Sequence, residues 1–144
     1  MRRILWGLAA LVGLAIIGFF LFAPGVVERG MNRQTGARFP VDAEARALHR
    51  KLTVIDLHAD TLMWKRDLLS ESDQGHVDLA RLETGNVALQ VFSSVTKTPR
   101  GQNYDRNSGD SDNITPLVIA QAQPPRTWTS LTERSLFHAE KLFD

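Results

Sequence analysis

The chain begins with a long run of apolar residues, and alternating apolar and polar positions follow only after it. Residues 4–23 carry no charged side chain over about 20 positions, the length that crosses the hydrocarbon core of a bilayer. Arg2 and Arg3 precede this run, so the positive-inside rule places the N-terminus in the cytoplasm and the remainder on the periplasmic or extracellular side. We expect residues 1–23 to form a single retained transmembrane anchor. A cleaved signal peptide is the alternative, although its apolar region is ordinarily shorter.

The part of the chain after the anchor divides into a linker and a folded unit. Residues 24–40 are rich in polar side chains and glycine, and we expect a linker that lifts the rest off the membrane. A folded unit is predicted for residues 41–144, and it begins with a short helix that Asp42 is placed to cap. The apolar run from Leu52 to about Ala59 then indicates a parallel strand covered on both faces.

Two more segments continue the alternation of strands and helices. A short helix is predicted with Asp78 as its N-cap and Gly85 just past its end. Residues 87–95 are rich in β-branched and aromatic side chains and indicate a second strand. This order predicts an α/β fold with a parallel sheet. Because two strands do not make a stable parallel sheet alone, we expect the sequence to be the front part of a larger protein.

The last third of the chain combines a polar loop with helices. Residues 96–113 form a long polar loop, and long loops are often functional. One or two helical turns are predicted over residues 114–123. Residues 127–144 have the pattern of one amphipathic helix, in which Ser130 and Glu133 have capping-box spacing. The apolar positions expected on its buried arc are Trp128, Leu131, Leu136, Ala139, Leu142 and Phe143.

Charge and composition narrow the possible partners and metal sites. The 17 basic and 16 acidic residues give a net charge of +1 without a basic stripe, so no nucleic-acid partner is expected. There is no cysteine, so any metal must be held by histidine, aspartate or glutamate. No serine-hydrolase elbow, P-loop or dinucleotide fingerprint is found, and no nucleotide cofactor is expected.

Two polar residues close the first predicted strand. His58 and Asp60 stand at positions i and i+2, so both point to one face at the carboxyl end, where active sites of α/β proteins lie. One nitrogen and one oxygen donor suit zinc. Asp56 shares that face one step deeper and is placed to orient a ligand. The alternative is a His–Asp pair that only caps the strand by hydrogen bonding.

Longer motifs surround this pair. The segments "VIDLHADT" and "GHVDLARLETGNVALQVFSSV" resemble the membrane dipeptidase (renal dipeptidase) family of zinc metallopeptidases, and "LTERSLFHAEKLFD" is similar to the helix that follows in that family. The resemblance covers about residue 45 to the end. The second segment matches the family pattern D-L-x-R-L-x-x-G-x-V-x-x-Q-x-F-S at Asp78, Leu79, Arg81, Leu82, Gly85, Val87, Gln90, Phe92 and Ser93.

The resemblance implies a fold and an activity. It implies a (β/α)8 TIM-type barrel with two zinc ions at its carboxyl mouth, of which this chain forms the first two βα units after a single transmembrane helix. A metal-bound hydroxide would hydrolyse a dipeptide. His58 and Asp60 carry over as ligands of one zinc. The family's bridging glutamate and the two histidines of the second zinc are expected downstream of Asp144, so no residue of this chain is assigned a catalytic role.

The other histidines and the capping aspartate are expected to be structural. His76 precedes the second short helix, where a surface histidine is favoured over a third metal ligand. Asp78 is expected to be a helix cap. His138 is expected to pack within its helix layer, and His49 to lie on a solvated helix.

Three features near the predicted site have weaker assignments. Gln90 is expected to be a buried, hydrogen-bonded glutamine rather than a site residue. Trp64 and the loop at residues 96–113 are equally consistent with a structural role and with walling a substrate pocket.

Other functional classes stay open at the level of sequence. One is a non-catalytic, membrane-tethered interaction module, either a truncated product or a degenerate relative of the enzyme. Another is a different metal-dependent amidohydrolase, although these more often open with H-x-H and residue 60 is aspartate. On the dipeptidase interpretation, the partners are a dipeptide substrate, the bilayer around residues 4–23 and, as an open alternative, a second copy in a homodimer.

Overall fold

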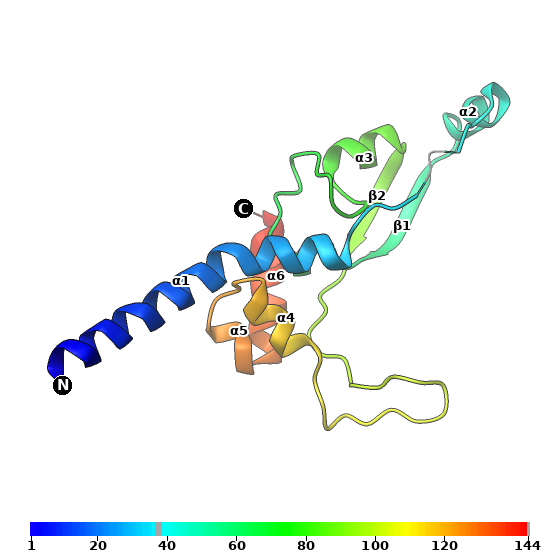
Figure 1. Ribbon diagram of the computed structural model, residues 1–144. Coiled ribbons are helices and arrows are strands. Elements are labelled where there is room, and N and C mark those ends of the chain that lie inside the picture. The colour runs from blue at the N-terminus through cyan, green and yellow to red at the C-terminus, as the bar shows by residue number, and fades with distance from the viewer. Residues whose placement is uncertain (37–38, 144) are drawn as a thin grey trace.

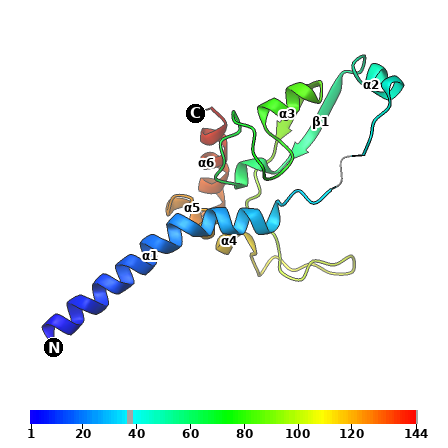
Figure 2. The ribbon, with the colours of Figure 1, turned by 45° about the horizontal axis from the view of Figure 1, so that its top comes forward.

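A computed structural model describes residues 1–36 and 39–143 of the chain (Figure 1). It is a mixed α/β structure in which a long apolar helix leads into the rest of the described chain, residues 32–36 and 39–143. This part, here called the body, contains two parallel strands. The first half of that helix projects away from the body in both views (Figure 1 and Figure 2). The elements in chain order are α1 (Arg2–Met31), α2 (Ala43–His49), β1 (Val54–Ala59), η1 (Thr61–Met63), α3 (Leu79–Thr84), β2 (Val87–Phe92), α4 (Ile114–Ala120), α5 (Arg126–Thr129) and α6 (Leu131–Phe143).

Helix α1 is longer than the predicted anchor. Within the described residues it is the one helix with the length and composition to cross a membrane, features that a signal sequence shares. It continues through Pro24 to Met31, so the linker prediction is wrong for residues 24–31. An internal proline costs about 3 kcal/mol, but Pro24 is buried against the body, and its carbonyl accepts a 3.2 Å hydrogen bond from Gln121. Residues 37–38 of the predicted linker lie outside the described part.

The two strands pair in parallel, as the order of elements predicted. Val54 lies beside Val87 and Ala59 beside Phe92 in the register. Both strands are shorter than predicted, because β1 begins at Val54 and β2 ends at Phe92. The finding supports the α/β class and the parallel strand pair; a complete barrel remains a prediction.

Strand β1 is not covered on both faces, contrary to the expectation from its apolar sequence, and β2 is also partly exposed. Four apolar side chains on them are at least 41% exposed: Ile55, Leu57, Leu89 and Val91. Helix α3 packs against β2, whereas α4, α5 and α6 gather beyond the carboxyl ends of the strands (Figure 1). Helix α3 therefore shields only part of the sheet, and among the described residues no helix covers these four exposed side chains.

The predicted C-terminal helix is divided in two. Ser130 has an extended conformation (φ −116°, ψ 118°) between α5 and α6, and its Oγ accepts a 3.2 Å hydrogen bond from Glu133 N. The capping role of Ser130 is thus confirmed, while a continuous helix from residue 127 is wrong. The extended Ser130 turns the chain and lets α5 and α6 pack on each other.

The buried face of α6 is polar, which also differs from the prediction. Leu131, Leu136 and Leu142 are at least 43% exposed, whereas Arg134 is 1% and His138 0% exposed. Arg134 is stable there because its guanidinium donates hydrogen bonds to several partners in the body. These partners are the carbonyl oxygens of Thr96, Thr127 and Trp128 and the side chains of Asp112 and Thr115.

Local capping predictions hold elsewhere. The Asp42 side chain accepts a 2.7 Å hydrogen bond from Ala45 N at the start of α2. The Asp78 side chain accepts one of 3.0 Å from Arg81 N at the start of α3, and Gly85 follows the end of that helix.

A small apolar core forms where η1 meets α4 and α5. Its members are Met63, Ile114 and Val118, with Trp64, Val95, Leu117 and Trp128 packed against them.

Candidate functional site

His58 and Asp60 lie close together, as their spacing predicted. His58 belongs to β1, and Asp60 follows that strand and precedes η1. His58 Nε2 is 3.1 Å from Asp60 Oδ1. The two side chains are 71% and 50% exposed, so the donor atoms face solvent rather than the core. An exposed pair at this edge is accessible to an ion or a substrate.

Ser93 completes this cluster from the neighbouring strand. It follows β2, and its backbone N–H donates a 2.9 Å hydrogen bond to Ala59 O, which continues the strand pairing by one residue. Its hydroxyl donates to Asp60 Oδ1 and lies 3.3 Å from His58 Nε2. Sequence reasoning named Ser93 only as part of a motif. The signal that would have found it is that carboxyl ends of paired parallel strands meet at one edge.

Asp56 supports the site through the backbone. Its Oδ1 accepts a 3.0 Å hydrogen bond from the backbone N–H of His58, so it orients the end of the strand rather than the imidazole ring. This backbone hydrogen bond lowers the pKa of Asp56 and keeps its carboxylate charged.

Gln90 lies beside Asp56 in the register of the strand pair. Its Nε2 donates a 3.1 Å hydrogen bond to Val91 O, while its buried Oε1 has no hydrogen-bond partner among the described residues. The prediction of a satisfied glutamine is therefore wrong for one of its two polar atoms, because the described residues bring no donor within reach of it.

The remaining histidines do not join His58. His49 is exposed on α2, and its Nε2 is 2.9 Å from Gly85 O. His76 is exposed, as expected for a surface histidine. His138 is fully buried, with Nδ1 2.8 Å from Ser94 Oγ, which confirms a packing role. In the part of the chain that the structure describes, no group of three histidine, cysteine, aspartate or glutamate residues is arranged to hold a metal.

Trp64 and the polar loop have structural contacts. Trp64 packs against the apolar core, and its carbonyl oxygen accepts a hydrogen bond from Lys141. Arg134 bonds to Thr96 O and to Asp112 and so holds both ends of the loop. The pocket-wall role stays a prediction for both.

A cavity of about 450 Å³ lies near the strand ends but does not contain the pair. Its lining is mainly apolar and comes from the segment after η1 and from α3, β2 and α6. Leu79, Leu82, Phe92 and Leu142 contribute to it, and His58 and Asp60 do not.

The donor atoms of the pair fit two corners of a zinc site. A tetrahedral zinc with nitrogen and oxygen ligands at about 2.0–2.2 Å holds those atoms roughly 3.4 Å apart. The observed 3.1 Å is close to that value, so only a small movement is needed. Imidazole nitrogen and carboxylate oxygen are also donors that zinc prefers.

Comparison with known proteins identifies no relative. No protein-family model, no curated protein and no solved structure matches the chain. The function is therefore inferred from the residues at the carboxyl ends of β1 and β2 and from the motifs around them.

Proposed function

We propose that this chain supplies the first metal-ligand pair of a zinc-dependent membrane dipeptidase, with His58 and Asp60 as ligands of one of two zinc ions. The observation that carries the proposal is the 3.1 Å approach of His58 Nε2 to Asp60 Oδ1 at the exposed carboxyl edge of two parallel strands. In (β/α)8 barrels this edge forms the mouth that carries the chemistry. The resemblance of the surrounding motifs to the membrane dipeptidase family supports the choice of reaction.

The residues of this chain have separate roles at such a site. His58 offers a nitrogen donor, and Asp60 offers a negatively charged oxygen donor. Asp56 holds the His58 backbone, and the Ser93 hydroxyl fixes one oxygen of Asp60. When bound, zinc supplies Lewis acidity that polarises a peptide carbonyl and acidifies water, so no serine or cysteine nucleophile is needed.

The proposal includes a retained anchor and further ligands. Residues 4–23 cross the membrane once with the N-terminus in the cytoplasm, so the metal site lies on the periplasmic or extracellular side. The bridging glutamate and the two histidines of the second zinc belong to later βα units of the same barrel.

The experiment combines zinc analysis with dipeptide hydrolysis on the protein expressed from the extended reading frame. We expect His58→Ala to abolish hydrolysis and to lower bound zinc toward one ion per chain, since the second zinc has other ligands. His76→Ala is the matched control, because His76 is exposed and should leave both measurements unchanged. The 144-residue chain alone should be inactive, and efficient, chelator-sensitive hydrolysis by it would overturn the proposal.

The Ser93 hydroxyl should contribute to zinc affinity without being a ligand. Residues that orient a ligand typically affect metal affinity by about tenfold or more. We expect Ser93→Ala to raise the zinc Kd of the full-length protein about tenfold in competition with a chelating dye. Ser70→Ala removes an exposed hydroxyl that bonds only to Asp67 among the described residues, and its Kd should not change. An unchanged Kd in Ser93→Ala would argue against this role.

A second candidate is a non-catalytic, membrane-tethered interaction module. The exposed apolar side chains of both strands favour it, since such surfaces ordinarily bind another protein segment. The downstream coding sequence discriminates between the two candidates. A glutamate and two histidines on later βα units support the enzyme, and a stop codon directly after Asp144 supports the module.

A further inference from the structure

One side of α1 contacts the body at every fourth residue. These contacts lie on a single face, because residues four apart in a helix are neighbours on its surface. In chain order, the contacts are Phe20 with Trp128, Pro24 with Gln121, Glu28 with Arg66 and, just past the helix end, Asn32 with Gly75. The helix is thus docked along the body over its last three turns rather than joined to it by a free linker.

The contacts become more polar toward the C-terminal end of α1. The rings of Phe20 and Trp128 stack with centroids 6.3 Å apart and planes 15° apart. Farther along, Gln121 Nε2 donates a 3.2 Å hydrogen bond to the Pro24 carbonyl.

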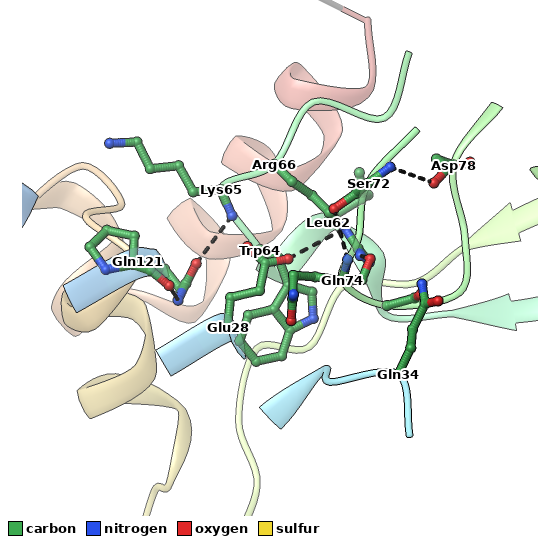
Figure 3. Close-up of polar contacts among 12 residues, drawn as sticks. Glu28, Gln34, Leu62, Trp64, Lys65, Arg66, Ser72, Gln74, Asp78 and Gln121 are labelled. Atoms are coloured by element: carbon green, nitrogen blue, oxygen red, sulfur yellow. Dashed lines mark hydrogen bonds and ion pairs between the residues drawn. The ribbon is translucent and has the colours of Figure 1, made fainter. Parts of the chain in front are cut away.

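The charged contact comes next along the helix. Glu28 is only 7% exposed, and its Oε1 lies 3.5 Å from Arg66 Nε (Figure 3). Burial raises the pKa of Glu28, and the charge of Arg66 opposes that shift. The body therefore offers an aromatic ring near the apolar segment and a cation beyond it.

The positions of these contacts along α1 indicate how far each contacting residue of the body lies from the membrane. A helix rises about 1.5 Å per residue, so Gln121, Arg66 and Gly75 are reached about 6, 12 and 18 Å farther along the axis than Trp128. Phe20 lies in the last turn of the apolar segment, residues 4–23. Trp128 therefore stands at the level where that segment ends.

Tryptophan suits this level of a bilayer. Its ring favours the boundary between acyl chains and headgroups, provided that the indole N–H has a partner. The Trp128 Nε1 donates a 2.9 Å hydrogen bond to Gln123 O. Neighbouring Arg126 and Thr129 on the same short helix are exposed.

We propose that α5 is seated on the outer surface of the bilayer, with Trp128 at the boundary between acyl chains and headgroups. The partner of this surface is the lipid bilayer itself, which continues from the lipid around α1. The body is then held against the membrane instead of being lifted away from it. This inference depends on the retained anchor of the proposed function, and it is independent of zinc and of dipeptide hydrolysis.

Fluorescence quenching in lipid vesicles tests this placement. The full chain is reconstituted in phosphatidylcholine vesicles that carry bromine atoms at shallow or deep positions of the acyl chain. Trp6→Phe with Trp64→Phe leaves Trp128 as the single tryptophan, since the chain has three. The matched control, Trp6→Phe with Trp128→Phe, leaves Trp64. We expect shallow bromine to quench Trp128 most, deep bromine to quench it less, and neither to quench Trp64 appreciably.

A second measurement leaves all three tryptophans in place. Because the chain has no cysteine, Thr129→Cys gives a unique site for a nitroxide spin label on α5, and Ser70→Cys gives one on the exposed segment after Arg66. The label at residue 129 should be more accessible to oxygen than to a water-soluble nickel chelate, and the label at residue 70 should show the reverse. The inference would be overturned if Trp128 and Trp64 were quenched equally or if both labels had the same accessibility. A mature chain that lacks residues 1–23 would also overturn it.

Discussion

Acidification from pH 6.5 to pH 4 should loosen α6, because the folded environment of His138 resists the proton that the unfolded chain takes up in this range. The imidazole is fully buried, with Nδ1 2.8 Å from Ser94 Oγ and Nε2 3.3 Å from Gln123 Nε2. Since the glutamine amide donates to Nε2, the proton of the neutral ring sits on Nδ1. Burial, reinforced by the charges of Lys141 and Arg134, lowers the pKa of His138 to about 4.

The size of the effect follows from the two pKa values. In the unfolded chain the pKa is 6.5, so between pH 6.5 and about pH 4 the unfolded state binds a proton that the folded state does not. The free energy of unfolding therefore falls as the pH decreases through this range, and the loss is complete near pH 4. At about 1.4 kcal/mol per pH unit, the loss is about 3 kcal/mol.

Hydrogen exchange of the α6 amides measures this loss in the full chain in lipid nanodiscs. After correction for intrinsic exchange rates, the opening free energy should fall by about 3 kcal/mol between pH 7 and pH 4. His138→Gln should remove most of this dependence, since a glutamine does not titrate. His76→Gln, a change at an exposed histidine, should retain it. The same loss in His138→Gln and in the unsubstituted chain would refute the reasoning.

Three further predictions concern the packing of the body and its place in the cell. Arg134→Met should lower the opening free energy of α6 by about 3–5 kcal/mol, because it removes the cation beside Asp112 and the donor of several buried carbonyl groups; an effect under 1 kcal/mol in the same exchange experiment would contradict this. A reporter fused after Asp144 should be active only in the exported compartment, and cytoplasmic activity would exclude the proposed topology. Residues 24–144 expressed alone should associate or fold poorly, and a sharp cooperative melt from a monomer in size-exclusion fractions would show otherwise.

Local features of the fold were predictable from the sequence because their causes are local. Asp42, Asp78 and Ser130 each accept a hydrogen bond from the backbone N–H of the residue three positions later. A spacing of three residues can be read directly from the sequence. The convergence of His58 and Asp60 has the same origin, since alternate residues of a strand share a face.

Features that depend on pairing between distant segments were not predictable in this way. Ser93 reaches Asp60 only because β2 lies parallel to β1 in one particular register, with Ala59 beside Phe92. A shift by one residue would turn the Ser93 side chain to the other face. The helical continuation through Pro24 likewise depends on its burial and on the hydrogen bond from Gln121, about a hundred residues away along the chain.

The buried face of α6 shows why apolar periodicity failed there. A hydrophobic pattern predicts the buried face only when polar side chains lack partners in the interior, since unpaired polar groups are costly to bury. Arg134 and His138 do have partners, in residues 94–96, in Asp112 and in α4 and α5, and so the polar face turns inward.

The leucines of α6 are exposed as a consequence of that inversion. Leu142 borders the apolar cavity near Phe92, and Leu131 and Leu136 remain open to solvent. Together with the exposed faces of β1 and β2, they form apolar surface that the described residues leave uncovered. In the proposed barrel, later βα units cover the strand faces; in the rival module, a partner protein does. In both cases the uncovered surface should drive association of residues 24–144 in water, whereas His58 and Asp60, at the solvent-facing edge, should stay accessible.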